Sequence, residues 1–255
     1  MTTTRKNPTA MNNRPDTGGL DGLLLVDKPA GITSHDVVHI IRRHFGIKKV
    51  GHGGTLDPAA TGLLLILLGR GTRLSSQVMS SNKTYEGIMR LGITTDSQDM
   101  DGEVTREADC SAITAEQIAA EMQKLTGDIM QTPPMVSAIK KNGVPLYKLA
   151  RKGVTVEREP RLIHVFNFSL LDFSPPRAQF RIKCTKGTYV RTLCHDIGEA
   201  LGCGACLEAL RRTQSGSYRV ERARTLDDLM QISRADLESL VIPFLQVKQD
   251  EQILC

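Results

Sequence analysis

The chain has 255 residues, 40% of them hydrophobic, which is enough to form a real core and excludes a chain that is disordered throughout. Lys and Arg outnumber Asp and Glu by 33 to 28, and the resulting net charge of +5 is a mild bias toward polyanionic partners. Because the sequence contains no apolar stretch of membrane-spanning length and no signal-peptide core, it predicts a soluble, cytoplasmic protein with no membrane contact.

The N-terminal part of the chain predicts a tail, a buried strand and a helix. Residues 1 to 20 are rich in Thr, Asn, Pro and Gly and predict a disordered tail. Residues 22 to 26 are apolar and predict a short strand, which the Pro and Gly of residues 29 to 31 end. A helix should follow, because Thr33 and Asp36 have capping-box spacing and the next apolar residues recur with helical period.

Residues 51 to 62, Gly-His-Gly-Gly-Thr-Leu-Asp-Pro-Ala-Ala-Thr-Gly, form a glycine-rich loop with one carboxylate, Asp57. Its glycines let the backbone approach a ligand closely. The apolar run Leu63 to Leu68 that follows predicts a strand buried on both faces, which would anchor the loop to the core. A carboxylate held in this way can act as a nucleophile or a base. The simpler interpretation is that Asp57 and Pro58 only form a turn.

The middle of the chain predicts a strand, an acidic loop and a helix. Residues 83 to 92 alternate around Tyr85 and predict a strand. Residues 94 to 102 predict a turn-rich loop, whose three aspartates lack the pattern of a calcium site and are expected to be solvated. Thr114 and Gln117 predict the cap of a second helix. Residues 131 to 138 should be extended because of their prolines, and a short helix is expected over 146 to 152.

Residues 162 to 171 and 178 to 185 predict a hairpin with one cationic face, which carries Arg181 and Lys183. Lys186 and a glycine then turn the chain into a helix that Thr188 is expected to cap. Tyr189 and Arg191 would project from the first turn of that helix. A last short strand is predicted over 217 to 220, followed by one helix after residue 225 and another over 235 to 241.

Cys203 and Cys206 have the spacing of a redox or zinc pair. A second ligand pair at zinc spacing is missing, so we interpret them as core thiols and expect no metal site. The chain has no Trp and four Tyr, so stacking on a nucleobase would fall mainly to residues such as Tyr85 and Tyr189.

Several motifs together resemble one family. They are residues 25 to 34, LVDKPAGITS, the glycine-rich loop, Lys83-Thr84-Tyr85, residues 186 to 191, KGTYVR, and Leu210-Arg211-Arg212. In this order they look like the TruB-type tRNA pseudouridine-55 synthases, over roughly residues 22 to 220. The resemblance implies an α/β fold of the α+β type, in which helices and loops flank a mixed, mostly antiparallel sheet.

The resemblance also implies a role for each motif residue. Asp57 would be the catalytic aspartate, Tyr85 would stack on the target uracil, and Arg191 would pair with Asp57. His52 would fill the place that the flipped base leaves. Tyr189 and Leu210 would line the uridine pocket. Contacts with the RNA backbone are expected from basic residues near the motifs, which are Lys28, Lys48, Lys49, Arg181, Lys183 and Lys186.

The expected substrate is the T-arm stem-loop of tRNA, bound by a monomer without a guide RNA. We expect the catalytic domain to span residues 21 to 220. Residues 221 to 255 would form a short C-terminal segment without a full RNA-binding domain of the PUA type. Isomerising uridine requires neither a redox change nor a new group, so no cofactor is expected. The sequence leaves open whether Asp57 attacks C1′ or C6 or removes the C2′ proton.

Two other classes of function stay open at this stage. A non-catalytic RNA chaperone could use the same cationic surface. A glycoside-cleaving hydrolase could use Asp57 as nucleophile, but it would need a second carboxylate as acid, and Glu86 is the only near candidate in the sequence.

Overall fold

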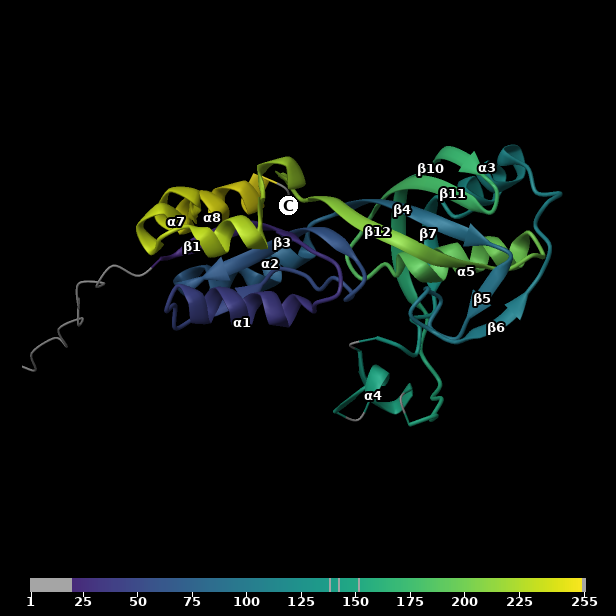
Figure 1. Cartoon of the computed structure of the whole chain (residues 1–255), viewed down its shortest axis with the longest axis horizontal. Coiled ribbons are helices and arrows are strands. Elements are labelled where there is room, and N and C mark those ends of the chain that lie inside the picture. The colour runs from purple at the N-terminus through teal and green to yellow at the C-terminus, as the bar shows by residue number, and fades with distance from the viewer. Residues whose placement is uncertain (1–19, 138, 142, 151, 254–255) are drawn as a thin grey trace, which may run out of the picture.

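The computed structural model describes residues 20–137, 139–141, 143–150 and 152–253. Within them, one mixed sheet of eleven strands runs the length of the molecule, in the order β14-β1-β3-β12-β4-β11-β10-β7, with β2, β13 and β15 attached (Figure 1). Most neighbouring strands are antiparallel, and only β1 with β14 and β12 with β3 are parallel. The predicted fold class is therefore confirmed. The predicted tail, apart from Leu20, lies outside the described residues.

The strands and helices have the following bounds. The strands are β1 (Gly22–Lys28), β2 (Val50–His52), β3 (Thr61–Leu68), β4 (Lys83–Leu91), β5 (Ile93–Thr95), β6 (Val104–Glu107), β7 (Gly127–Gln131), β8 (Lys140–Lys141), β9 (Val144–Pro145), β10 (Arg161–Ser174), β11 (Arg177–Cys184), β12 (Ala205–Ser215), β13 (Tyr218–Arg219), β14 (Arg224–Thr225) and β15 (Ile242–Pro243). The helices are α1 (Ser34–His44), α2 (Ser75–Ser80), α3 (Ala115–Lys124), α4 (Leu146–Ala150), α5 (Val190–Ala200), α6 (Leu226–Gln231), α7 (Arg234–Leu240) and α8 (Phe244–Ile253), with 3₁₀ turns at Gly69–Leu74 and Val220–Arg222.

Strands β1 and β3 are mostly apolar because both of their faces are covered. Leu24, Leu64 and Ile66 pack into one core with α1, α6 and α7. Leu23 and Leu65 point to the other face and share a second core with residues of α2 and α8. The predicted buried strands are thus confirmed, as is the predicted helix, whose Thr33 cap has both hydrogen bonds of a capping box.

The other half of the sheet has one covered and one open face. On the covered face, side chains of β11 such as Phe180 and Ile182 pack in a single core with residues of α3 and α5. Arg181 and Lys183 alternate with these residues and so project from the open face. The predicted hairpin is confirmed as β10 and β11. The strand register places Tyr85 opposite Ile182 and Glu86 opposite Arg181, so Tyr85 belongs to the covered face and Glu86 to the open face.

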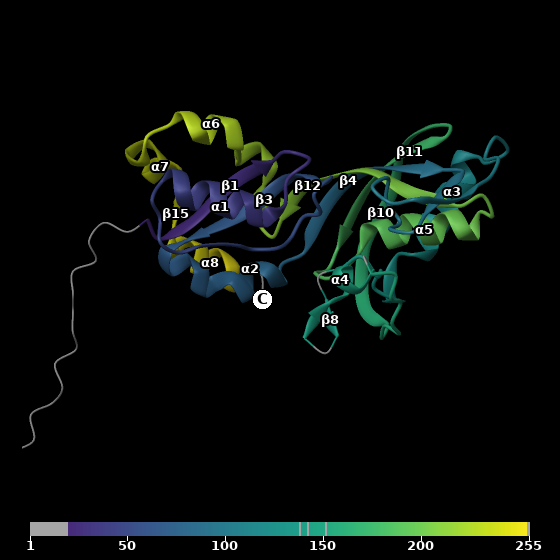
Figure 2. The same ribbon diagram turned by 60° about the horizontal axis from the view of Figure 1, so that its bottom comes forward.

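Between β7 and β10 the chain leaves the sheet in an excursion that contains β8, β9 and α4, which projects away from the body (Figure 2). The short helix predicted over 146 to 152 is α4, which ends at Ala150. The two predicted C-terminal helices are confirmed as α6 and α7. Residues after 220 also supply β14 and β15, which both pair with β1, so this segment packs into the same cores as the N-terminal strands.

Gly198 on α5 marks the closest approach of this helix to β12. A Cβ atom added to Gly198 would lie 2.0 Å from the backbone nitrogen of Ala205. In an open helix interior, Gly→Ala stabilises by about 1 kcal/mol. Here we expect Gly198→Ala to lower the free energy of unfolding by about 1–3 kcal/mol, because the helix must move away from the sheet. Urea denaturation measures this change.

Gly51→Ala is the matched control, since a Cβ at that position would meet only Cγ2 of Thr72, at an ordinary 3.8 Å. Its free energy of unfolding should stay within about 0.5 kcal/mol of the parent value. A Gly198→Ala protein as stable as the parent would contradict the close packing of α5 on β12.

Candidate active site

Asp57 sits on the glycine-rich loop, which is tied to the core on both sides of the carboxylate. The Ser34 hydroxyl donates to the Leu56 carbonyl at 3.1 Å and accepts from the Leu56 amide at 2.9 Å. The Gly31 amide donates to the Pro58 carbonyl at 2.9 Å. The loop backbone is therefore fixed while the Asp57 side chain stays 48% exposed. The predicted anchoring of this loop is confirmed.

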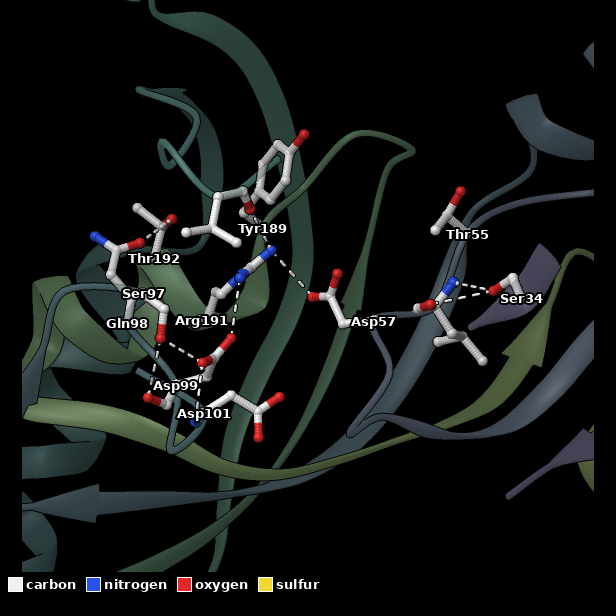
Figure 3. A network of polar contacts seen from close by, with 12 residues as sticks. Ser34, Thr55, Asp57, Ser97, Gln98, Asp99, Asp101, Tyr189, Arg191 and Thr192 are labelled. Carbon is white, nitrogen blue, oxygen red and sulfur yellow. Dashed lines mark hydrogen bonds and ion pairs between the residues drawn. The ribbon is translucent and has the colours of Figure 1, made fainter. Parts of the chain in front are cut away.

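The buried guanidinium of Arg191 makes contacts in three directions (Figure 3). One nitrogen lies 3.1 Å from the Asp57 carboxylate and also donates to the Val136 carbonyl at 2.8 Å. Another nitrogen donates to the Asp99 carboxylate at 2.9 Å. Asp99 of the acidic loop and Val136 of the excursion therefore hold Arg191 in place, and its guanidinium presents a fixed positive charge to Asp57.

Asp99 corrects a prediction, because the aspartates of residues 94 to 102 were expected to be solvated. Its side chain is only 16% exposed. Besides Arg191, it accepts hydrogen bonds from the Ser97 hydroxyl and the Asp101 amide. No spacing in the sequence indicates this role, because Asp99 and Arg191 are 92 positions apart and meet only through the folding of the sheet.

The acidic loop is pinned in place by β12 and α5. The Leu207 amide donates to the Gln98 carbonyl at 3.0 Å, and the Met100 amide donates to the Leu207 carbonyl at 3.1 Å. Gln98 has a φ of 66°, a conformation that costs a non-glycine residue energy. Its side-chain oxygen accepts a 2.7 Å hydrogen bond from the Thr192 hydroxyl, which helps to hold this conformation.

Helix α5 begins one residue later than predicted, and Thr188 does not cap it. Tyr189 is the N-cap residue, and its own side chain makes no capping hydrogen bond. The Gln131 side chain clamps the Tyr189 backbone instead, accepting from its amide at 2.8 Å and donating to its carbonyl at 3.0 Å. Gln131 thereby fixes the first turn of the helix that carries Arg191, and no motif or spacing in the sequence indicates this role.

Opposing influences act on the ionisation of Asp57. Loss of water around the carboxyl raises its pKa above the ordinary value, and the negative charges of Asp99 and Asp101 raise it further. Arg191, and to a smaller extent Lys28, lower the pKa of Asp57. Arg191 is thus the main group that favours the carboxylate in surroundings that disfavour charge.

Tyr85, Tyr189 and Leu210, the residues predicted to line the uridine pocket, are partly buried. Tyr85 and Leu210 pack against the core of the covered face. Burial raises the pKa of both tyrosine hydroxyls, and the charge of Asp57 adds to that rise in each case. His52 lies on β2 opposite Ile66, and burial lowers the pKa of its imidazole. Of these four residues, Tyr85 and Tyr189 are the two whose pKa the charge of Asp57 raises.

Lys28 corrects the prediction of a phosphate contact, because its side chain is fully buried. Its ammonium donates to the carbonyls of Pro29 and Ile32, both at 2.8 Å, and of Pro58 at 3.0 Å. Burial lowers the pKa of Lys28 to about 8, while Asp57 opposes this shift. Lys28 therefore supports the loop from beneath and is closed off from a bound RNA.

Arg181 and Lys183 lie on the face of the sheet away from Tyr85, and their predicted contact with the RNA backbone stays a prediction. Both project from the open face, whereas Tyr85 lies on the covered face. Arg181 is paired with Glu86 at 2.7 Å, and Lys183 lies 5.5 Å from the centre of the Phe166 ring. The exposed lysines nearer the predicted motifs are Lys48, Lys49 and Lys186.

The thiols of Cys203 and Cys206 are buried, and Cys206 lies 3.4 Å from the Met100 sulfur. Among the described residues, no cluster of three or more potential metal ligands is found. No helix in that part of the chain is long and apolar enough to cross a membrane.

Comparison with protein families assigns residues 42–246 of the chain. Residues 42–190 match the TruB family pseudouridylate synthase N-terminal domain, and residues 191–246 match the tRNA pseudouridylate synthase B C-terminal domain. The chain belongs to the TruB family. A tRNA pseudouridine synthase B from Opitutus terrae is 52% identical over 89% of this chain and 94% of its own length. The corresponding protein from Syntrophotalea carbinolica is 48% identical over 91% and 76%, respectively.

Solved structures agree with this assignment of the TruB fold. A chain in the crystal structure of a Cbf5-Nop10-Gar1 complex superposes with a TM-score of 0.72 at 30% identity, and the match covers 91% of this chain and 62% of that one. A chain of an archaeal box H/ACA sRNP Nop10-Cbf5 complex gives a TM-score of 0.66 at 28% identity. This TruB-family chain is therefore a pseudouridine synthase.

Replacing Arg191 by Gln should raise the pKa of Asp57, because partial loss of water and the charges of Asp99 and Asp101 continue to disfavour the carboxylate after its nearest positive charge is gone. Carbon-13 NMR of the Asp57 carboxyl group, followed through an acid titration, measures this shift. Arg181→Gln is the control, since it removes a paired arginine from the open face. An unchanged Asp57 titration in Arg191→Gln would contradict the ion pair.

Proposed function

We propose that this chain converts the uridine at position 55 in the T-loop of tRNA to pseudouridine, with Asp57 as the catalytic carboxylate. The observation that carries this proposal is the ion pair between Asp57 and the buried Arg191, on a loop that the core holds on both sides. Membership in the TruB family and relatives named tRNA pseudouridine synthase B support the substrate class.

The reaction needs one well-placed carboxylate. Uridine becomes pseudouridine when the bond from N1 to C1′ breaks, the uracil rotates while it is held, and C5 joins C1′. C5 then loses its proton and N1 gains one, so the product is an isomer of the substrate. Nothing is oxidised or reduced and no group is added, so a cofactor has no task. Asp57 must be ionised to attack C1′ or C6, or to remove the C2′ proton, and Arg191 favours that ionised form.

A uridine inside a folded RNA loop must leave its stack before a side chain can reach its sugar. Tyr85 would stack on the extruded uracil, and Leu210 and Tyr189 would line the pocket around it. His52 would enter the RNA at the vacated place. The partial burial of Tyr85 and Leu210 on the covered face suits an apolar wall for a flat base.

The RNA backbone would contact exposed lysines near the motif residues, foremost Lys186, three residues before Tyr189. We propose that the chain works as a monomer in the cytoplasm and without a guide RNA. Relatives between 44% and 52% identical are named tRNA pseudouridine synthase B, whereas the matched chains from Cbf5 complexes are at most 30% identical.

A glycoside hydrolase fits this site less well. Glu86, the second carboxylate that the sequence offers, lies on the open face and is paired with Arg181. Asp99 lies across Arg191, but its oxygens accept hydrogen bonds from Arg191, Ser97 and the Asp101 amide. A carboxylate that accepts from three donors is poorly suited to deliver the proton that a leaving group needs.

Asp57→Asn should abolish pseudouridine formation while tRNA affinity stays within a few-fold, because the change removes a reactive group and keeps the binding surface. Carbodiimide modification and primer extension on an unmodified tRNA transcript detect the product, and filter binding gives the affinity. Asp101→Asn is the matched control, since Asp101 is close enough to influence Asp57 but is not paired with Arg191. Turnover near the parent rate in Asp57→Asn would contradict the proposal that Asp57 is the catalytic carboxylate.

Lys186→Gln should weaken tRNA binding and reduce its dependence on salt concentration. In a plot of log affinity against log salt concentration, each phosphate contact with a double-stranded nucleic acid contributes a slope of about −0.9. Lys183→Gln is the control, because this lysine has the same charge on the open face, three positions away. Titrations between 50 and 200 mM salt, a range of about fourfold over which such contacts are resolved, measure both slopes. Equal effects of the two variants would contradict the proposal that Lys186, and not Lys183 on the open face, contacts the RNA backbone.

A further inference from the structure

Arg212 is the largest fully buried side chain that the structure describes, with 1% of its surface exposed. Its guanidinium donates to the carbonyls of Leu63 at 2.7 Å, Gly54 at 3.1 Å and Thr55 at 3.3 Å. In the part of the chain that the structure covers, no carboxylate is paired with it. Burying a cation costs free energy unless the cation is well hydrogen-bonded. The three carbonyls therefore stabilise the buried charge, and Arg212 in turn holds these carbonyls in place.

Two of the three carbonyls belong to the glycine-rich loop, and the third belongs to the strand that follows it. Gly54 and Thr55 come shortly before Asp57, and Leu63 lies on β3, directly after the loop. Arg212 is next to Gly62 in the parallel pair of β12 and β3. Gly62 has a φ of 97°, and a Cβ there would lie 2.4 Å from the Arg212 carbonyl. The loop that carries Asp57 therefore packs against both the backbone and the side chain of Arg212.

Arg212 also lies next to Tyr85. The two residues are direct partners in the antiparallel pair of β12 and β4, so their side chains project from the same face of the sheet. Arg212 opposes the burial that raises the pKa of the Tyr85 hydroxyl. One guanidinium thus contacts the Asp57 loop on one side and faces the Tyr85 strand on the other.

We propose that Arg212 is a positioning residue that sets the separation between Asp57 and Tyr85, and with it the width of the gap in which the uracil is held. This inference rests on the function proposed above for Asp57 and Tyr85. Arg212 is inaccessible to substrate, so it acts through the loop and the strand and not on the reacting atoms.

An arginine suits this task better than a lysine. The planar guanidinium presents five N–H donors in a fixed fork, so it can hold three carbonyls that approach from different directions. A lysine would keep the positive charge beside Tyr85 but concentrate its donors on a single nitrogen. Arg212→Lys therefore separates the charge of Arg212 from its geometry.

The neighbouring residue is a matched control. Arg211 has the same chemistry on the same strand, but its side chain points to the opposite face and forms a two-bond ion pair with Asp27, at 2.9 and 2.6 Å. Arg211 is also the register partner of Glu86, on the open face. Changes at Arg211 therefore test the effect of losing a strand arginine without touching the Asp57 loop.

The experiment compares Arg212→Lys, Arg212→Gln, Arg211→Lys and Arg211→Gln in the full chain. Single-turnover rates at saturating enzyme on a tRNA transcript, tRNA dissociation constants and melting temperatures are measured for each. A misplacement of about 1 Å can lower a rate on the order of 10²-fold. We expect the Arg212 variants to react between about 10-fold and 100-fold more slowly when saturated, with affinities within a few-fold, while the Arg211 variants stay within about threefold.

A second readout follows the loop itself. The charged groups that face Asp57 are Arg191, Asp99, Asp101 and Lys28, and Arg191 is the strongest of those that lower its pKa. If the loop moves away from Arg191, the pKa of Asp57 rises, and the acid limb of the rate profile moves to higher pH. Carbon-13 NMR of the Asp57 carboxyl group reports the same shift without any need for turnover.

The outcomes are separable. Slower saturated rates together with a raised Asp57 pKa in Arg212→Lys support the proposal, whatever Arg212→Gln does to folding. The proposal is overturned if the Arg212 variants lose activity only in proportion to their unfolded fraction, or if they match the Arg211 variants. If the parent protein makes no pseudouridine, the proposed function fails. In that case the Asp57 titration of Arg212→Lys still decides whether Arg212 positions the loop.

Discussion

The buried guanidinium of Arg191 is the group on which the arrangement of the site depends. It joins the Asp57 loop, the Asp99 loop and the Val136 carbonyl of the excursion, three segments that come from distant parts of the chain. Arg191 is thus a shared partner of all three segments. Because the cation is buried, losing any one partner would leave unsatisfied polarity in a place that water enters poorly, so the three segments are held together as one unit.

The supports of this unit come from β7, α5 and β12. Gln131 fixes the backbone of Tyr189 and so the start of α5, while the Gln98 side chain and backbone attach the acidic loop to α5 and β12. Lys28 and Arg212 approach the Asp57 loop from beneath and donate hydrogen bonds to its backbone carbonyl oxygens. Cations and amides thus hold the loop around the Asp57 carboxylate, and of Arg191, Lys28 and Arg212 only Arg191 forms an ion pair with it in the described residues.

The two faces of the sheet explain why similar residues differ in what they can do. On the open face, arginines of β11 and β12 are paired with Glu86, Glu208 and Asp27, so their charges are largely cancelled at the surface. Such exposed pairs contribute little to stability and offer little field to a polyanion. On the covered face, helices exclude water from the same sheet, and the charges that remain there act over longer distances and shift the pKa of their neighbours.

The sequence by itself determined the local features whose causes lie within a few residues. Helix caps such as Thr33, the apolar strand after the Asp57 loop and the β10–β11 hairpin could all be predicted, because capping and alternation are short-range properties. Only the tertiary structure decided the rest. Asp99 and Gln131 join the site, Lys28 is buried, and Arg181 turns away from it, because strand register and helix packing bring together residues that no spacing connects. In a sheet, a shift of one residue moves a side chain to the other face, so the face on which a charge lies is settled by pairing across the sheet and not by its own neighbours.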